Sequence, residues 1–386
     1  MNKNSITLLC RVVDNFGDIG FVFRLAKSIT EKSPETKITL ICSDLKSFSL
    51  MENKIQADMK IQTVEYKKSS WLVLDWNLCE DDLKELKSGK WNFDDSFPLI
   101  LECFQCGRPS WLEEILFCKE NNKIHHILNI EYLTAEDYAE DFHLLKSYTR
   151  SSNVKKVFFM PGFTPKTAGL VIDENFLILS KENHLKNENV FKISLFSYER
   201  DCTDIFDALT EFQEKIRAEI NKNFCVEVYA AQGKSLSFAQ DAWNKTGKKI
   251  SFFPQKFMSQ TEYDKLLLSM DINFVRGEET LARACLCSKP FLWQAYIQDE
   301  NYQLVKVNAL LDRIRKFFPE KSWICIKKLF LDYNTPHSRL EKENLLFLFG
   351  ETYSGKLTEN FKGFSDELFS QGELTENLLD YIEKLP

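Results

Sequence analysis

The sequence predicts an α/β protein of two doubly wound domains, each a mostly parallel sheet with helices on both faces. Short apolar runs alternate with amphipathic runs along the chain, which is typical of strands and helices around a parallel sheet. The alternation begins again after a proline- and glycine-containing segment, residues 158–177, and a polar linker, residues 180–189. A chain of 386 residues also suits two domains of ordinary size better than one.

The first half supplies the elements of the first domain in order. Residues 5–13 are apolar and predict a strand, and apolar residues recur three and four positions apart in residues 19–33, which predicts a helix. Residues 75–89 are polar and predict a helix or a loop. A proline near the start of residues 108–122 is typical of the first turn of a helix. Further apolar runs predict strands at residues 37–44, 97–106 and 123–133.

The second half repeats both patterns. Strands are predicted at residues 190–198, 224–233, 248–255, 271–277 and 289–296, and helices at residues 203–220, 260–270 and 278–288. The expected domains are residues 1–183 and 184–365. The tail, residues 366–386, is expected to form a helix that returns to the first domain.

Composition excludes several classes of function. A net charge of −7 argues against nonspecific nucleic-acid binding. No run of about 18 apolar residues predicts a membrane span, and no signal peptide is evident, so a cytoplasmic protein is expected. The eleven cysteines are then expected to be reduced. Cys103 and Cys106 form one Cys-x-x-Cys pair without a second pair or a nearby histidine, so neither a metal nor another cofactor is expected.

The stretch VVDNFGDIG places Asp14 and Asp18 in a turn between the first strand and the first helix. Asp18 is well suited to cap that helix, and this is one interpretation of it. The stretch lacks the three-glycine pattern of a dinucleotide loop, so an NAD site is not predicted. The other interpretation is a ligand site, because ligands bind at the carboxyl edge of such sheets.

Candidate ligand residues also follow three predicted strands of the second domain. The stretch NFVRGEETLARA begins a helix whose backbone N–H groups can bind an anion, although acidic residues in a first turn also simply favour a helix. Aromatic residues two apart at a strand end can belong to the core or form a platform for a base or sugar. The candidates are Arg276, Glu278, Glu279 and Thr280, the pair Phe196 and Tyr198, and Phe252 with Gln255.

Two tandem domains of this kind fit glycosyltransferases of the GT-B type, and also periplasmic binding proteins and some dehydrogenases. The fold alone therefore does not distinguish these three classes of protein. The motifs VVDNFGDIG, NIEYLTAEDY, MPGFTPKTAGLV, SLFSYE, VRGEET and KPFLWQAYIQDE together resemble those of the EarP family, in order and position. The resemblance implies an inverting GT-B enzyme. Its reaction would transfer L-rhamnose from dTDP-β-L-rhamnose to an arginine of elongation factor P (EF-P).

The resemblance also implies roles for single residues. Asp14 and Asp18 match essential aspartates, with Asp18 the expected general base, and Glu278 matches an essential glutamate. Glu279 and Thr280 depart mildly from the usual Asp and Ser, and Gln294 and Ile297 stand where His and Pro are usual. The residues expected to bind the donor are Phe196, Tyr198, Phe252, Gln255, Arg276, Glu278, Glu279 and Thr280.

Acidic residues suit this chemistry because an arginine guanidinium is a cation and a poor nucleophile. A carboxylate can orient its planar N–H fork and accept a proton as the new bond forms. Helix N-terminal amides near Thr280 and the hydroxyl of Tyr198 are expected to stabilise the leaving diphosphate. Two alternatives remain open, namely a GT-B transferase for another acceptor and a non-catalytic nucleotide-sugar binding protein. Neither nucleic acid nor membrane is expected as a partner.

Overall fold

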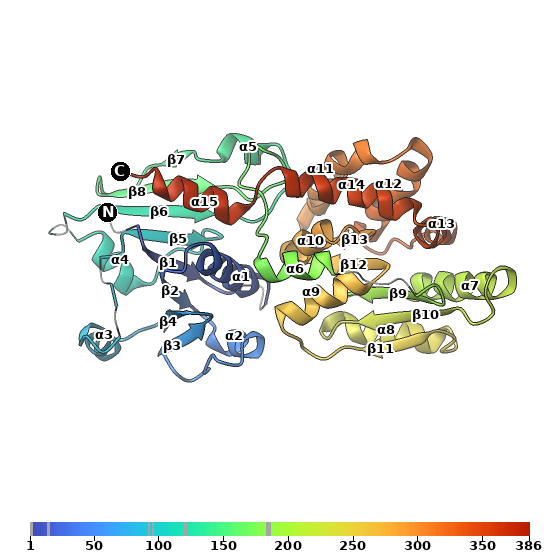
Figure 1. Cartoon of the computed structure of the whole chain (residues 1–386), viewed down its shortest axis with the longest axis horizontal. Coiled ribbons are helices and arrows are strands. Elements are labelled where there is room, and N and C mark those ends of the chain that lie inside the picture. Colours follow the sequence, from blue (N-terminus) through green and yellow to red (C-terminus); the bar gives the residue numbers. More distant parts are fainter. Residues whose placement is uncertain are drawn as a thin grey trace. The chain divides into compact units, whose positions relative to one another are not determined.

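The computed structural model describes residues 3–13, 16–91, 93–94, 96–118, 120, 122–182 and 187–386. The chain forms two compact units, each with one central sheet flanked by helices (Figure 1). The first unit is Met1–Glu174 with Gln371–Pro386, and the second is Asn175–Ser370. The predicted fold class, α/β with doubly wound domains, is confirmed.

The first unit contains an eight-stranded sheet in the order β3-β4-β2-β1-β5-β6-β8-β7. The inner strands are parallel, and the edge strands β3 and β7 are antiparallel to their neighbours. The strands are β1 (Ser5–Cys10), β2 (Lys37–Cys42), β3 (Ile61–Tyr66), β4 (Ser69–Asp75), β5 (Leu99–Cys103), β6 (His125–Ile130), β7 (Lys146–Ser147) and β8 (Val154–Phe159). The helices are α1 (Gly17–Lys32), α2 (Leu45–Met51), α3 (Glu80–Lys87), α4 (Ser110–Leu116), α5 (Tyr138–Phe142) and α15 (Leu374–Glu383).

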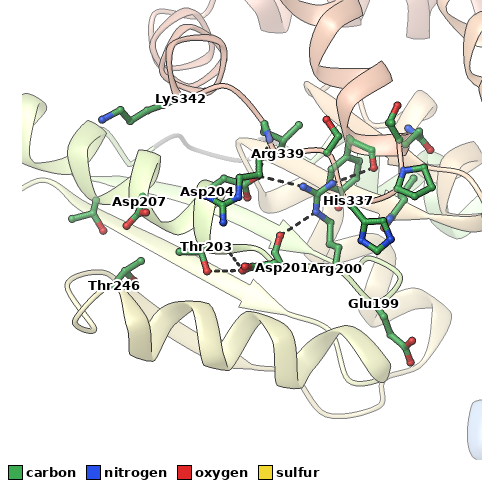
Figure 2. A pocket seen from close by; sticks show the side chains of 18 of the residues that line it. Glu199, Arg200, Asp201, Thr203, Asp204, Asp207, Thr246, His337, Arg339 and Lys342 are labelled. Atoms are coloured by element: carbon green, nitrogen blue, oxygen red, sulfur yellow. Dashed lines mark hydrogen bonds and ion pairs between the residues drawn. The ribbon is translucent and has the colours of Figure 1, made fainter.

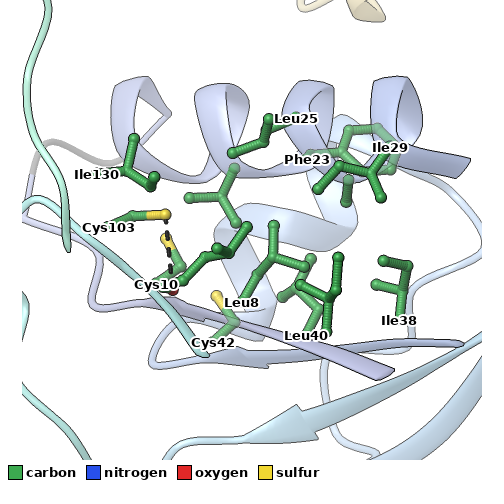
Figure 3. Packing of buried hydrophobic residues seen from close by; sticks show 14 of the residues in the cluster. Leu8, Cys10, Phe23, Leu25, Ile29, Ile38, Leu40, Cys42, Cys103 and Ile130 are labelled. Carbon is green, nitrogen blue, oxygen red and sulfur yellow. Dashed lines mark hydrogen bonds between the residues drawn. The ribbon is translucent and has the colours of Figure 1, made fainter. Parts of the chain in front are cut away.

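Helices cover both faces of this sheet because its central strands are apolar on both sides. Every residue of β1 is buried. Side chains alternate between the two faces of a strand, so Leu8 packs with Leu25 of α1, whereas Leu9 packs with Leu112 of α4. Figure 3 shows the cluster on the α1 face, where Cys10 also lies.

The C-terminal helix returns to the first unit, as the sequence predicts. The tail forms two helices rather than one, since α14 ends at Ser370 and α15 begins at Leu374. The Leu374 N–H donates to the Leu170 carbonyl at 2.9 Å, and the Asn377 side-chain amide donates to the Ala168 carbonyl at 3.0 Å. These contacts attach α15 to the segment that follows β8.

Gly169 makes this attachment possible, and replacing it with alanine is expected to destabilise the first unit. Its φ is +81°, and a Cβ there would lie 2.9 Å from the Gly372 carbonyl oxygen. Gly89→Ala is the matched control, because Gly89 has a φ of +86° and nothing within 4 Å of the added carbon. Left-handed backbone costs both variants about 1–2 kcal/mol. We expect a further loss of stability only in Gly169→Ala, measured as a lower urea midpoint than that of Gly89→Ala. Equal midpoints of the two variants would contradict this prediction.

The second unit contains a five-stranded, fully parallel sheet in the order β11-β10-β9-β12-β13. The strands are β9 (Val190–Leu195), β10 (Cys225–Ala230), β11 (Ser251–Pro254), β12 (Ile272–Arg276) and β13 (Phe291–Gln294). The α-helices are α6 (Glu174–Lys181), α7 (Thr203–Glu219), α8 (Lys234–Lys245), α9 (Gln260–Ser269), α10 (Gly277–Leu286), α11 (Gln303–Ile314), α12 (Glu320–Asn334), α13 (Lys342–Tyr353) and α14 (Lys356–Ser370).

The boundary between the units differs from the expected boundary at residue 183. The second unit begins at Asn175, so nearly all of α6 belongs to it. The physical reason is Phe176, which is fully buried and has the Arg283 guanidinium 4.9 Å from its ring centroid. At the other end, the second unit extends past residue 365 to Ser370, because α14 continues without a break to that residue.

Candidate active site

The first unit has its topological switch point between β1 and β5. The chain leaves β1 toward β2 on one side of the sheet and continues through β5 on the other, so the loops after β1 and β5 diverge there. Ligands of doubly wound folds bind at this point. Asp18 lies beside it, in the first turn of α1. Asp14, the other acidic residue predicted in this turn, lies outside the described residues.

The Asp18 carboxylate is held by groups from two segments. Its Oδ2 accepts the Val13 N–H at 2.8 Å, and its Oδ1 accepts the Tyr132 hydroxyl at 3.0 Å. The residue is only 2% exposed. Asp18 does not cap α1, because the N-cap position is Phe16, which makes no side-chain cap. The capping interpretation is therefore wrong, since Asp18 ties together the loops after β1 and β6.

Aromatic residues surround this carboxylate. The rings of Tyr132 and Phe104 are stacked, with centroids 4.1 Å apart and planes inclined by 12°, and Phe21 lies 5.2 Å from Phe104. Phe104 and Gln105 follow β5 with φ of 62° and 49°, a left-handed backbone that is uncommon outside glycine. Burial raises the pKa of the neighbouring Glu131 carboxyl. The Asp18 site (Asp18, Phe104 and Tyr132) thus combines a carboxylate with flat apolar surfaces, which suits a planar cation.

The second unit has its switch point between β9 and β12. The loop after β9 carries Phe196 and Tyr198, and β12 ends at Arg276. The Arg276 guanidinium lies 4.5 Å from the centroids of both rings. No carboxylate of the described residues forms an ion pair with it, so its N–H groups are available to an anion. The guanidinium therefore lies over one face of each ring that is predicted to stack a base.

The first turn of α10 adds backbone donors beside Arg276. The first N–H groups of an α-helix have no acceptor within the helix. The N-cap residue of α10, Arg276, makes no side-chain cap hydrogen bond to them. The Thr280 hydroxyl donates to the Arg276 carbonyl. The Glu278 carboxylate lies 3.7 Å from the Lys306 ammonium, and Glu279 lies 4.0 Å from the buried Arg283. The Arg276 site (Phe196, Tyr198, Arg276 and the first turn of α10) therefore presents a cation, amides and two carboxylates.

Phe252 and Gln255 are not brought into contact with this group. Phe252 lies in β11 and Gln255 follows it directly, and β10 lies between β11 and β9. The Phe252 ring is stacked on Trp243 of α8, with centroids 5.3 Å apart. The Gln255 side-chain amide donates to the Phe253 carbonyl at 2.9 Å. Their predicted role in donor binding stays a prediction.

Sequence reasoning missed the residues that hold the two loops of the Arg276 site. Gln294 Oε1 accepts the Tyr198 N–H at 2.8 Å, and Trp293 Nε1 donates to the Gly277 carbonyl at 3.0 Å. Asn334 of α12 fixes the backbone around them, since it accepts the Ala295 N–H and donates to the Trp293 carbonyl, both at 2.8 Å. The available signal was the position of Trp293 and Gln294 at the carboxyl end of a predicted strand.

Gln294→Leu is expected to raise the KM for the ligand of the Arg276 site and to lower the stability of the second unit. Leucine has a similar size but leaves the Tyr198 N–H without its acceptor, and an unsatisfied buried group costs about 1–3 kcal/mol. Steady-state kinetics and urea unfolding measure the two effects. Gln294→Glu keeps an acceptor oxygen and should retain more affinity for this ligand than leucine. Equal KM values for wild type and Gln294→Leu would show that Gln294 does not position the loop.

A polar groove of about 1030 Å³ lies beside this site in the second unit (Figure 2). Arg200 lies in its wall, 4.5 Å from the Tyr333 ring centroid and 3.3 Å from Asp204, whose carboxylate also accepts the Leu340 N–H. None of the predicted site residues lines the groove, although Gln294 and Ile297 do. This ion pair, the ring contact and the hydrogen bond join the start of α7 to the 333–340 segment, so the groove wall contributes to stability.

The described residues also bear on the predictions about metal ligands and membrane-spanning helices. Within the described ranges, no group of three or more His, Cys, Asp or Glu residues is placed to hold a metal ion. Cys103 and Cys106 are both free thiols, and burial raises the pKa of Cys106 to about 12. Among the helices of the described residues, none combines the length and apolar character needed to span a membrane.

Known structures share this fold over the whole chain. A structure described as the structural basis for EarP-mediated arginine glycosylation of translation elongation factor EF-P has a TM-score of 0.55 and 18% identity, and 99% of each chain is covered. A UDP-glucose: anthocyanidin 3-O-glucosyltransferase in complex with UDP has a TM-score of 0.54 and 10% identity, and 100% of each chain is covered. Identities this low show the fold alone.

Two Rossmann-like domains, each with a candidate ligand site at its switch point, give the chain the GT-B fold. The family model for the Elongation-Factor P (EF-P) rhamnosyltransferase EarP matches residues 6–383. The protein-arginine rhamnosyltransferase of Shewanella oneidensis is 31% identical over 345 residues, 80% of each chain. The chain belongs to the EarP family, which confirms the resemblance and excludes the non-catalytic alternative.

Proposed function

We propose that this chain transfers L-rhamnose from dTDP-β-L-rhamnose to one arginine side chain of EF-P, with inversion at the anomeric carbon. Family membership supports the class of reaction, and the name of the family supports EF-P as the acceptor. The observation that carries the proposal is the Asp18 carboxylate, fixed at the switch point of the first unit beside stacked aromatic rings. A guanidinium fits such a site by charge and by shape.

Asp18 is proposed to act as the general base. In this step the arginine nitrogen forms a bond to the anomeric carbon, the bond from that carbon to the diphosphate oxygen breaks, and one guanidinium proton passes to Asp18. The Tyr132 hydroxyl occupies one carboxylate oxygen in the structure. An incoming guanidinium N–H is therefore expected to replace that hydroxyl on Oδ1. The Val13 N–H can keep its bond to the other oxygen.

The Arg276 site is proposed to hold the diphosphate of the donor. Arg276 carries a fixed positive charge, and the backbone amides at the start of α10 follow directly after the same strand end. As dTDP departs, negative charge grows on the diphosphate, and both groups stabilise it without the need for a metal ion. Glu278 and Glu279 are better suited to hydroxyl groups of the sugar than to phosphate.

The proposal is tested by incubating the protein with dTDP-β-L-rhamnose and EF-P and measuring the intact mass of EF-P. We expect EF-P to gain the mass of one deoxyhexose, and no gain when its acceptor arginine is changed to lysine. An NMR coupling constant at the anomeric carbon of the product reports whether the configuration is inverted. EF-P of unchanged mass would contradict the proposed function.

A further inference from the structure

An exposed apolar surface adjoins the Asp18 site. Within residues 132–148, Tyr148 is fully exposed and five further large apolar side chains are between 39% and 47% exposed. We call this surface the 132–148 strip, and it consists of Tyr132, Tyr138, Phe142, Leu144, Leu145 and Tyr148. Exposed apolar residues are ordinary when they are scattered, but a contiguous group marks an interaction surface.

The strip follows one edge of the sheet of the first unit. It begins after β6, continues through α5 and ends at β7, the last strand in the sheet order (Figure 1). The Leu144 N–H donates to the Phe158 carbonyl at 2.8 Å, and the Phe158 N–H donates to the Leu145 carbonyl at 2.9 Å. The strip is therefore attached to β8 on one side only. An edge strand offers its outer backbone groups to another chain.

The strip begins at the proposed acceptor site. Tyr132, its first residue, donates its hydroxyl to Asp18, and its ring is stacked on Phe104. The Tyr138 and Phe142 rings meet edge to face, with centroids 5.9 Å apart, and Phe142 lies 6.2 Å from Phe158. A partner bound on these rings would extend to the carboxylate that is proposed to act on arginine.

The end of the strip near α5 is negatively charged. Residues 131–141 contain five acidic residues and no lysine or arginine, namely Glu131, Glu136, Asp137, Glu140 and Asp141. One of them, Glu140, is paired with Lys166 at 3.0 Å. The pKa of His143 is lowered to about 4 by burial, so this histidine adds no positive charge near neutral pH. A partner with apolar and positively charged groups would complement this surface.

We propose that the 132–148 strip is the docking surface for the protein acceptor, which presents its arginine to Asp18 from a basic, partly apolar face. The inference rests on the proposed function, because the acceptor is EF-P. Apolar contact along the strip would supply affinity, and the acidic end would orient the basic face of EF-P. Docking would thus be separate from the chemistry at Asp18.

The test is the double variant Leu145→Ser with Tyr148→Ser, since both side chains are exposed and neither belongs to the Asp18 or Arg276 site. We expect the KM for EF-P to rise about tenfold, the effect of losing about 1.4 kcal/mol at an interface. The kcat at saturating EF-P and the KM for dTDP-rhamnose should stay within about twofold of the wild-type values, because neither the chemical step nor donor binding involves the strip. Added salt should also raise the wild-type KM for EF-P.

Ile178→Ser with Ile220→Ser is the matched control, because both side chains are exposed residues of the second unit. This variant should keep the wild-type KM for EF-P. An unchanged KM in the strip variant would overturn the docking inference while leaving the proposed function intact. If wild type transfers no rhamnose, the proposed function fails, and calorimetric titration of EF-P without donor still decides whether the strip binds it. Equal affinity of wild type and strip variant in that titration would overturn the inference.

Discussion

Asp18→Asn is expected to slow rhamnose transfer to EF-P by about 10²–10⁴-fold, the usual contribution of a general base. Asparagine has the same shape and keeps one oxygen for the Val13 N–H, but it has no negative charge to orient a guanidinium or accept its proton. Donor affinity should not change, because the proposed donor residues belong to the second unit. Single-turnover mass measurements of EF-P give the rate, and calorimetry gives the donor affinity.

Tyr132→Phe is the control for this result. It removes the hydroxyl that donates to Asp18 but keeps the carboxylate and the ring stacked on Phe104. Its transfer rate should stay much closer to wild type than that of Asp18→Asn. A near wild-type rate in Asp18→Asn would show that another group accepts the proton. Thermal unfolding of both variants separates a chemical effect from a loss of structure.

The periodicity of the sequence predicts most central elements of the fold, because buried parallel strands and amphipathic helices have clear patterns. The hairpin of β3 and β4 was not predicted. Its turn contains Lys67, with a φ of 52°, where a glycine or asparagine would have been the usual signal. Helices α11 to α13 were also not assigned. They pack on one another in sequence order and α12 also packs on β13, whereas α13 packs on α7, which lies far away in the sequence. Local patterns do not contain that last contact.

Some features of the candidate sites were likewise predictable from the sequence, and others were not. Asp18 and Arg276 were predicted as site residues because each lies at the junction of a strand and a helix, which the sequence indicates directly. The stacking of Arg276 between Phe196 and Tyr198 was not predictable, because it requires β9 to pair with β12 across many intervening residues. Phe252 illustrates a different limit. The direction in which a strand residue points depends on the register, which is set by neighbouring strands.

The second large effect concerns Arg276. The guanidinium lies 4.5 Å from the centroids of two aromatic rings, with no carboxylate of the described residues paired to it. Each ring contact contributes about 0.5–1 kcal/mol at an exposed site, which fixes the position of the cation without using its N–H groups. A cation prepared in this way loses little freedom when a diphosphate binds.

Arg276→Gln is expected to lower kcat by about 10²–10³-fold, the usual effect of removing one preorganised group that stabilises developing charge. The affinity for dTDP, measured by calorimetry, should fall as well. Arg276→Lys keeps the charge but not the planar fork, so it should restore only part of both quantities. Arg200→Gln is the matched control, because Arg200 also lies on a ring but is paired with Asp204. It should lower the urea midpoint without changing the dTDP affinity. Wild-type dTDP affinity in Arg276→Gln would place the diphosphate elsewhere on the second unit.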